Sequence, residues 1–419
     1  MNAIDHTIVA EIGQMVDAQP GLADRLTDWI TLDRAGHYLS TIESILAPSQ
    51  TARWTRAPVI ARLLRDDGLL GTSRLIWDSN YEGSGNAALL LGREPKRKRV
   101  WLLAHLDQIS YLVDPGDGDR YPLMPLCYHM QHDGCRPAVA LIHDLRAGAL
   151  VVQARGAIEV DGESVTFVVE NGGPLGAGTR VVYDSHLVWD RETNGLRGYL
   201  DDSLACTAML LAAGVLHHEP VEVLFGFTDE EEGPAGNANQ SFGRGGRRLI
   251  DSFPPPDLVI ASDVHEAEAT NHGPGPRHLH PGDGAVFAER SSNGRGGVTP
   301  PHLYALQAHL AAALRPRGTR LHENWGGYVA RGEDINAVAV TPNVALLGIL
   351  CSNRHYAMDQ PAANLADVLD LARAFVAYTL LVHSDLWPRL TSAAEIEPGA
   401  GRTSAGARPL PKIVLPATV

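Results

Sequence analysis

Four short apolar runs, separated by longer segments of helical periodicity, constrain the fold of this chain more than any other feature. They occupy residues 100–104, 222–227, 258–261 and 344–350. Runs of this length are typical of strands that are buried on both faces of a sheet, as parallel strands covered by helices are. The alternation therefore predicts an α/β fold in which a doubly wound, mainly parallel sheet is flanked by helices.

The segments between the runs predict helices. One helix is expected over 201–218, where two aspartates suit an N-terminus and an apolar stripe follows. Another is expected over 364–383. The first ~75 residues also carry helical periodicity, but they show no recognisable chemistry. The apolar faces expected in this opening part include Ile4, Ile8, Ile12, Met15, Leu22, Leu26 and Trp29.

Residues 115–197 have a different pattern, with short alternating pieces such as "VTFVVE" and "TRVVYD" between "DG", "GG" and "GAG" turns. This pattern predicts an inserted, barrel-like antiparallel β domain. We therefore expect a main domain in two parts, 1–114 with the N-terminal helices and 198–390, on either side of the insert. Residues 391–419 are rich in Pro, Gly, Ala and Ser, which predicts a loosely ordered tail or an arm onto a neighbouring subunit.

The charge of the chain limits its partners. Its 419 residues include 35 basic and 49 acidic side chains, a formal net charge of −14. This balance argues against a general binder of nucleic acid or of an anionic membrane. No opening segment combines a basic region with an apolar stretch, and no run approaches the ~20 apolar residues of a membrane span, so we expect a cytoplasmic protein.

Four adjacent carboxylates, "DEEE" at 229–232, directly follow the second apolar run. Like charges near a buried strand repel one another and lose hydration, so some must take up protons or find a cation. An isolated acidic run is more often a solvated turn. The question is therefore whether the rest of the chain supplies partners for a cation.

Polar side chains of metal-binding type follow each of the four runs. In an open α/β sheet the carboxyl ends of the strands meet at one edge, where ligands bind. A further aspartate, Asp201, opens the helix after the insert, where the positive helix end keeps it ionised and able to bridge two ions. The expected ligands of a pair of zinc-like ions are His105, Asp201, Glu231, Asp263 and His355.

Three neighbours of these ligands have expected roles of their own. If Glu231 holds a metal, Glu230 is left to accept a proton from an activated water. Asp107 is expected to fix the ring of His105 by accepting its other N–H. His265, two residues after Asp263, fits either a structural position or the wall of the same pocket.

At this point the chain resembles the M42 family of dinuclear metallo-aminopeptidases, within the wider M20/M28/M42 clan. The motifs that carry the resemblance lie between about residues 98 and 380: "LLAHLDQISYLV", "GAGTRVVYD", "GYLDDSLACTAMLLAA", "FTDEEEGPAG" and "LVIASDV", followed by "GEDINA" and "NRHYAMDQP". The insert between His105 and Asp201, and the short interval from Asp263 to His355, match M42 better than the M20 carboxypeptidase pattern.

The resemblance implies a mixed sheet of the zinc-peptidase type and two divalent ions, zinc or cobalt. It implies that His105 and Asp263 hold one ion, that Glu231 and His355 hold the other, that Asp201 bridges them, and that Glu230 is the general base. It also implies a cis peptide between Asp201 and Asp202, short peptides as substrates, and homo-oligomers from dimers to dodecamers built through the β domain.

The chain departs from the family pattern in three places. Ser203 stands where the family has arginine after the paired aspartates, "NRHYAMDQP" replaces a more regular "RYIHSP"-like motif, and the N-terminal extension is longer.

Two alternatives to an aminopeptidase remain. One is an amidohydrolase or deacylase that acts on a small non-peptide metabolite with the same machinery. The other is a non-catalytic scaffold that keeps the fold and uses its acidic surface and tail for assembly.

Overall fold

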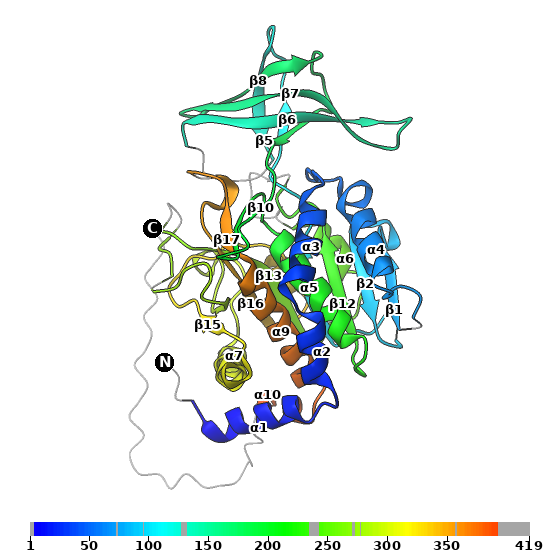
Figure 1. Ribbon diagram of the computed structural model, residues 1–419, viewed down its shortest axis with the longest axis vertical. Coiled ribbons are helices and arrows are strands. Elements are labelled where there is room, and N and C mark those ends of the chain that lie inside the picture. The colour runs from blue at the N-terminus through cyan, green and yellow to red at the C-terminus, as the bar shows by residue number, and fades with distance from the viewer. Residues whose placement is uncertain are drawn as a thin grey trace, which may run out of the picture.

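An eight-stranded mixed sheet forms the centre of the main body (Figure 1). The computed structural model describes residues 4–72, 74–94, 96–126, 132–233, 243–269, 273–276, 278–356 and 358–392. The strand order is β1-β2-β12-β3-β13-β16-β14-β15. The strands are β1 (Leu75–Asp78), β2 (Ala87–Leu91), β3 (Val100–His105), β12 (Val223–Thr228), β13 (Leu258–Glu266), β14 (Ala285–Ala288), β15 (Leu321–Glu323) and β16 (Val344–Cys351).

The four strands predicted from the apolar runs form the parallel centre of this sheet. Strands β12, β3, β13 and β16 lie side by side and pair in parallel. Every residue of β3 is buried: Val100 and Leu102 join the core on one face of the sheet, and Trp101 and Leu103 join the core on the other. Burial on both faces explains why the run is continuously apolar.

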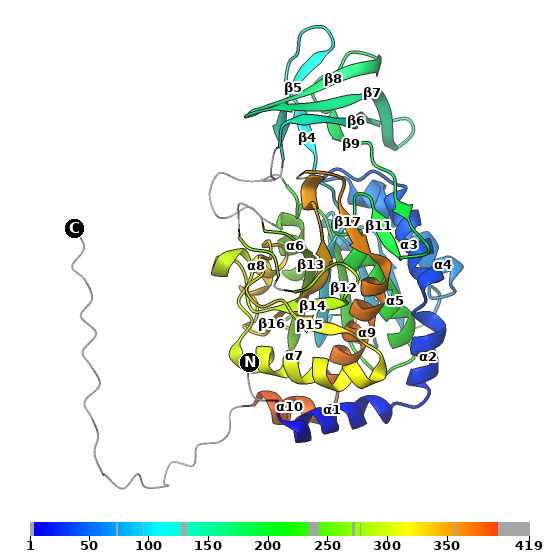
Figure 2. The same cartoon turned by 60° about the vertical axis from the view of Figure 1, so that its left-hand side comes forward.

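Helices cover both faces of the sheet (Figure 2). Helices α5 and α9 pack directly on one face, and α6 and α8 on the other. Asp202 caps α5 by accepting a hydrogen bond from the Ala205 N–H, and Asn364 caps α9 in the same way from Ala366. The bounds of these helices are α5 (Ser203–Leu216), α6 (Arg244–Ile250), α8 (Asp334–Ala337) and α9 (Leu365–Val382).

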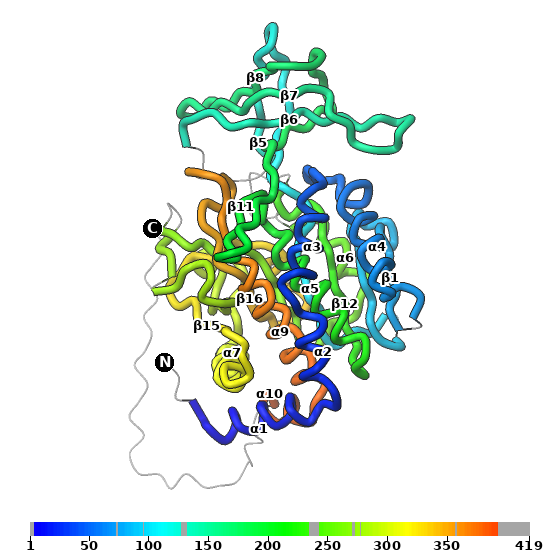
Figure 3. The backbone as a smooth tube through the Cα atoms, in the orientation of Figure 1, coloured from blue at the N-terminus to red at the C-terminus, as the bar shows by residue number. Residues whose placement is uncertain are grey.

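The N-terminal helices form an outer layer over α5 and α9. In Figure 3 helix α1 lies beside α7 and α10 from the other end of the chain. Their bounds are α1 (His6–Asp17), α2 (Leu22–Trp29), α3 (Leu32–Glu43), α4 (Arg56–Asp66), α7 (Pro301–Leu314) and α10 (Leu386–Thr391). None of the helices within the described residues is both long and apolar enough to cross a membrane.

A closed six-stranded barrel stands above the carboxyl ends of the central strands (Figures 1 and 2). Its strand order is β4-β5-β8-β7-β6-β9. The β domain predicted over 115–197 is a barrel that begins earlier, at Tyr111, and ends earlier, at Tyr183. The bounds are β4 (Tyr111–Val113), β5 (Arg120–Pro125), β6 (Gly134–Asp144), β7 (Ala149–Asp161), β8 (Ser164–Gly172) and β9 (Arg180–Tyr183).

A small second sheet joins the barrel to the main body. Strands β10 (Val188–Trp189) and β11 (Gly195–Arg197) pair with β17 (Ala362–Asn364) rather than with the barrel. Residues 186–197 thus return the chain to the level of the sheet just before Asp201. The barrel core continues into this region, because Tyr183 packs against Tyr356 with ring centroids 4.3 Å apart.

Candidate metal-binding active site

The carboxyl ends of the four central strands place the predicted side chains together. Thr228, the last residue of β12, pairs in register with His105, the last residue of β3. Asp263 lies within β13, level with Gly348 of β16. His355 belongs to a short 3-10 turn, Arg354–Tyr356, that follows β16 closely. The parallel register therefore brings chemistry from distant parts of the sequence to one edge.

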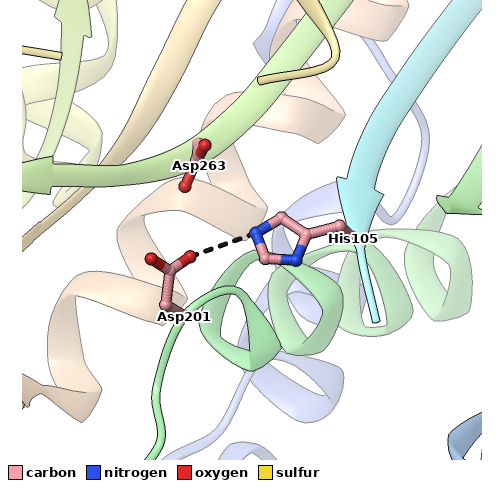
Figure 4. Close-up of side chains that lie close together, drawn as sticks. All are labelled: His105, Asp201 and Asp263. Atoms are coloured by element: carbon pink, nitrogen blue, oxygen red, sulfur yellow. Dashed lines mark hydrogen bonds and ion pairs between the residues drawn. The ribbon is translucent and has the colours of Figure 1, made fainter. Parts of the chain in front are cut away.

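His105, Asp201 and Asp263 form one group of possible metal ligands, which we call position A (Figure 4). The Nε2 atom of His105 lies 3.1 Å from Oδ1 of Asp201. One ligand atom from each of the three residues lies within 4.8 Å of the other two. Glu231 lies beside this group, with Oε2 3.8 Å from His105 Nε2.

Asp201, Glu232 and His355 form a second group, which we call position B. The Nε2 atom of His355 lies 3.2 Å from Oδ2 of Asp201 and 2.9 Å from Oε1 of Glu232. Asp201 thus turns one oxygen toward each histidine. The peptide between Asp201 and Asp202 is cis, as the resemblance implied.

The structure does not bring Glu230 into either position, nor into the further possible ligand group that Glu231 and Glu232 form with His105. Its backbone has a left-handed φ of 61°, and its carboxylate pairs with Arg248 in a shallow hollow beside Trp54 and Ser84. The preceding Asp229 fixes this turn, because its Oδ1 accepts a hydrogen bond of 2.8 Å from the Glu230 N–H. The turn carries Glu230 away from the cluster and directs the next two carboxylates, Glu231 and Glu232, into it.

The carboxylate of Asp107 holds the loop that carries these two glutamates. It accepts the backbone N–H of Glu231 at 3.1 Å and that of Glu232 at 3.2 Å, and Ser49 donates its hydroxyl at 2.6 Å. His105 instead places Nδ1 3.0 Å from the main-chain oxygen of Asp107, with the carboxylate 3.7 Å away. Asp107 therefore supports the histidine through its backbone and the acidic loop through its side chain.

Gly332, in the "GEDINA" segment, allows the acids to approach closely from a third direction. A Cβ at this position would lie 2.8 Å from Oδ2 of Asp263 and 3.1 Å from Oε1 of Glu231. A side chain would therefore displace both carboxylates. His265 lies behind the cluster with its Nδ1 3.0 Å from the amide of Asn324, and burial lowers its pKa to about 3, which makes it a neutral structural residue.

The pKa shifts in the cluster show a demand for positive charge. Burial raises the pKa of Glu231 and of Asp263 well above the usual carboxyl range. Burial also opposes the charge of Asp201, but hydrogen bonds from His105 and His355 hold its pKa well below the usual range. Burial and Arg354 oppose protonation of His355, yet Glu232 and Asp201 raise its pKa to about 9. The acids thus favour any cation that can lie among them.

The residues at position A fit a divalent ion. Because the main-chain oxygen of Asp107 can only accept, Nδ1 of His105 carries the proton that bonds to it, which leaves Nε2, the atom that faces Asp201, as the one that can bind an ion. Tetrahedral zinc with bonds of about 2.0–2.1 Å separates its ligand atoms by about 3.3 Å, close to the 3.1 Å seen here.

A buried ion pair fixes the loop before Asp201 to the N-terminal helices. Arg56 of α4 lies 2.9 Å from Oε1 of Glu43, and both side chains are buried. Glu43 also accepts the Tyr199 N–H at 3.0 Å and the hydroxyl of Ser203. The serine that departs from the family motif thus has a partner in the N-terminal extension.

Three residues near the cluster were not singled out from the sequence. Glu232 had an indication in the sequence, because it belongs to the same acidic run, but the run does not show which of its side chains point into the site. Arg354 and Glu43 had none, because each acts through a partner far away in the chain: Arg354 bonds to Glu266 of β13, and Glu43 bonds to Tyr199 and Ser203.

Comparisons with known proteins identify the fold. No family model and no curated protein matches the chain. An aminopeptidase from the archaeon Desulfurococcus kamchatkensis superposes with a TM-score of 0.65 at 15% identity, covering 87% of this chain and 99% of its own. The TET1 peptidase of Pyrococcus horikoshii, described as able to assemble into a tetrahedron or a large octahedral shell, gives 0.59 at 15% identity, covering 82% and 99%.

A third similar structure carries a different title. The endoglucanase of Thermotoga maritima gives a TM-score of 0.54 at 14% identity and covers 82% of this chain and 98% of its own. At these identities the similarity establishes the fold alone, and one fold can serve several activities. The function must therefore be argued from the site.

Proposed function

We propose that this protein is a metal-dependent aminopeptidase of the M42 type that removes N-terminal residues from short peptides. The observation that carries the proposal is the buried cluster in which positions A and B share Asp201 at the carboxyl ends of four strands. Two divalent ions, zinc or cobalt, are the proposed cofactors, because the donors are imidazole nitrogens and carboxylate oxygens. Aminopeptidase titles among the similar structures support the same activity.

Divalent ions at this site supply Lewis acidity toward a peptide carbonyl and toward water. The side chains hold and move the protons. His105 keeps its proton on Nδ1 through the Asp107 carbonyl, which leaves Nε2 to serve as a ligand. Asp107 and Ser49 orient the acidic loop. A carboxylate beside the ligands then accepts the proton of the attacking water and returns it to the leaving amine.

We assign that general base to Glu231 and the ligand role to Glu232, one residue later than the sequence alone suggested. Glu231 is buried beside position A, with Oε2 3.8 Å from His105 Nε2, and Glu232 lies nearer His355, with Oε1 2.9 Å from its Nε2. Glu230 is neutralised by Arg248 on the far side of the turn. The assignment still pairs one base with one ligand at adjacent positions, but these are now Glu231 and Glu232, the second and third glutamates of the run.

Paired substitutions test this assignment. Glu231→Gln is expected to lower kcat for aminoacyl p-nitroanilides by roughly 10²–10⁴-fold with the metal content unchanged. Glu230→Gln is the matched control, and it is expected to stay within a few-fold of the wild type because its side chain lies outside the cluster. A Glu231→Gln enzyme with normal turnover would remove the assigned role. Hydrolysis of N-acyl amino acids in place of aminoacyl amides would identify a deacylase.

Assembly and location follow as parts of the same proposal. We propose a homo-oligomer, from a dimer up to a dodecamer, formed through the barrel. Apolar side chains at Met124, Val151 and Val152 are exposed on its strands, as an interface formed by these strands requires. A cytoplasmic location suits an enzyme whose substrates are short peptides and whose surface carries a net negative charge.

A further inference from the structure

A cation from the chain itself already lies at position B. The Nη1 atom of Arg354 is 3.0 Å from Nε2 of His355 and 3.5 Å from Oδ2 of Asp201. These two atoms are the ones that His355 and Asp201 offer to position B. The guanidinium therefore lies beside the same two atoms that a second divalent ion would use.

The arginine is held in this place from both sides. Its Nε donates a hydrogen bond of 3.1 Å to Oε1 of the buried Glu266, and only 12% of its side chain is exposed. The turn that carries it is constrained, since Asn353, His355 and Tyr356 all have left-handed φ values between 54° and 59°. Tyr356 is anchored in turn against Tyr183. These contacts fix the position of Arg354 within the site.

A guanidinium keeps its charge at all working pH values, so it cannot make room for an ion by losing a proton. An ion bonded to His355 Nε2 at about 2.0–2.1 Å would lie no farther than about 5 Å from Nη1. Two positive charges at this separation in a buried site oppose each other strongly. Position A differs, because its histidine nitrogen faces Asp201 Oδ1 and the carboxylate of Asp263.

We propose that Arg354 is a resident cation at position B, so that the protein binds one divalent ion tightly at position A and a second only weakly. This inference rests on the proposed function and refines it. The guanidinium supplies part of the positive charge that the carboxylates of Glu232 and Asp201 would otherwise obtain from a second ion. The departure of "NRHYAMDQP" from the family motif places this arginine directly beside His355.

The test is a titration of demetallated full-length protein with Zn²⁺, followed by calorimetry, and with Co²⁺, followed by its visible spectrum. The wild type is expected to bind one equivalent at least ~100-fold more tightly than the second. Arg354→Gln removes the charge and is expected to tighten the second equivalent by at least ~10-fold while leaving the first unchanged. Arg248→Gln, which removes an arginine outside the cluster, is the matched control and should bind metal as the wild type does.

Two results would overturn the proposal: two equivalents of similar affinity in the wild type, or an unchanged second equivalent in Arg354→Gln. The wild-type stoichiometry alone decides the first point, even if the variant does not fold. In the double variant Arg354→Gln and His355→Ala the tightened second equivalent should disappear, which locates it at position B. Failure to bind any divalent ion would instead refute the metal-dependent function itself, so the two failures are distinguishable.

Discussion

The ion pair between Arg56 and Glu43 offers the sharpest test of how the N-terminal extension supports the site. Both side chains are fully buried, and their closest atoms are 2.9 Å apart. Arg56 also donates to the main-chain oxygens of Leu106 at 3.0 Å and Ile45 at 3.2 Å. Arg56→Met keeps an apolar stem of similar length but leaves a buried carboxylate without its cation. Removing one partner of a buried pair costs about 3–5 kcal/mol of unfolding free energy.

The experiment compares thermal and urea midpoints of four proteins. Arg56→Met is expected to melt about 5–10 °C below the wild type, given the usual entropy of unfolding for a large domain. Arg56→Met combined with Glu43→Gln is expected to recover roughly 2 kcal/mol, because no unpaired charge remains. Arg247→Met is the matched control: its exposed pair with Asp251 is expected to contribute less than about 0.5 kcal/mol.

The outcome also bears on the metal site. Leu106 lies between His105 and Asp107, and Glu43 holds the backbone of Tyr199, two residues before Asp201. Loss of Arg56 is therefore expected to weaken metal binding as well as stability, whereas Arg247→Met changes neither. If Arg56→Met shifts the midpoints no more than Arg247→Met does, or if the double variant is less stable than the single one, the buried pair does not stabilise this region as argued.

Two further predictions concern packing and pH. Gly214→Ala is expected to lower stability by about 1–3 kcal/mol in a urea titration, because the new Cβ would lie 1.7 Å from Nε1 of Trp29, whereas Gly173→Ala, with open space around it, should have little effect. Burial raises the pKa of Asp367 to about 7, so its contribution to stability is present below about pH 4 and is lost as pH rises through 7, by at most about 4 kcal/mol. Asp367→Asn keeps the acceptor for the Gly282 N–H and should flatten the fall in urea midpoint between pH 5 and 8. An unchanged slope would show that Asp367 is not the group responsible for this fall.

The central strands could be predicted because burial on both faces imposes continuous apolar runs on them. The strands at the edge of the sheet were harder to predict. β2 (Ala87–Leu91) is also fully buried, but a run of alanine and leucine suits a helix as well as a strand. The barrel was foreseeable from its alternation and turns, whereas the return of β10 and β11 to the main body depends on pairing with β17, far along the chain.

The convergence of His105, Asp263 and His355 could be expected because parallel strands share their carboxyl edge, and Asp201 was added from its place at the start of the helix that follows the insert. The order of roles within the acidic run could not. A sequence pattern cannot distinguish three consecutive glutamates from one another. The direction in which each side chain points is set by the left-handed backbone of Glu230 and by the carboxylate of Asp107, which follows a different strand. Such choices depend on hydrogen bonds between distant segments.

The same aromatic side chains join the barrel to the cation site. Tyr356 follows His355 and packs against Tyr183 of the barrel and against Tyr199, at centroid distances of 4.3 and 5.4 Å. Tyr199 in turn donates its hydroxyl to the Ile109 oxygen at 2.6 Å, at the exit of β3 toward the barrel. Because close-packed rings transmit displacement, a shift of the barrel on its base moves the turn that carries Arg354 and His355. The geometry of position B is therefore tied to the placement of the domain through which we propose that subunits assemble.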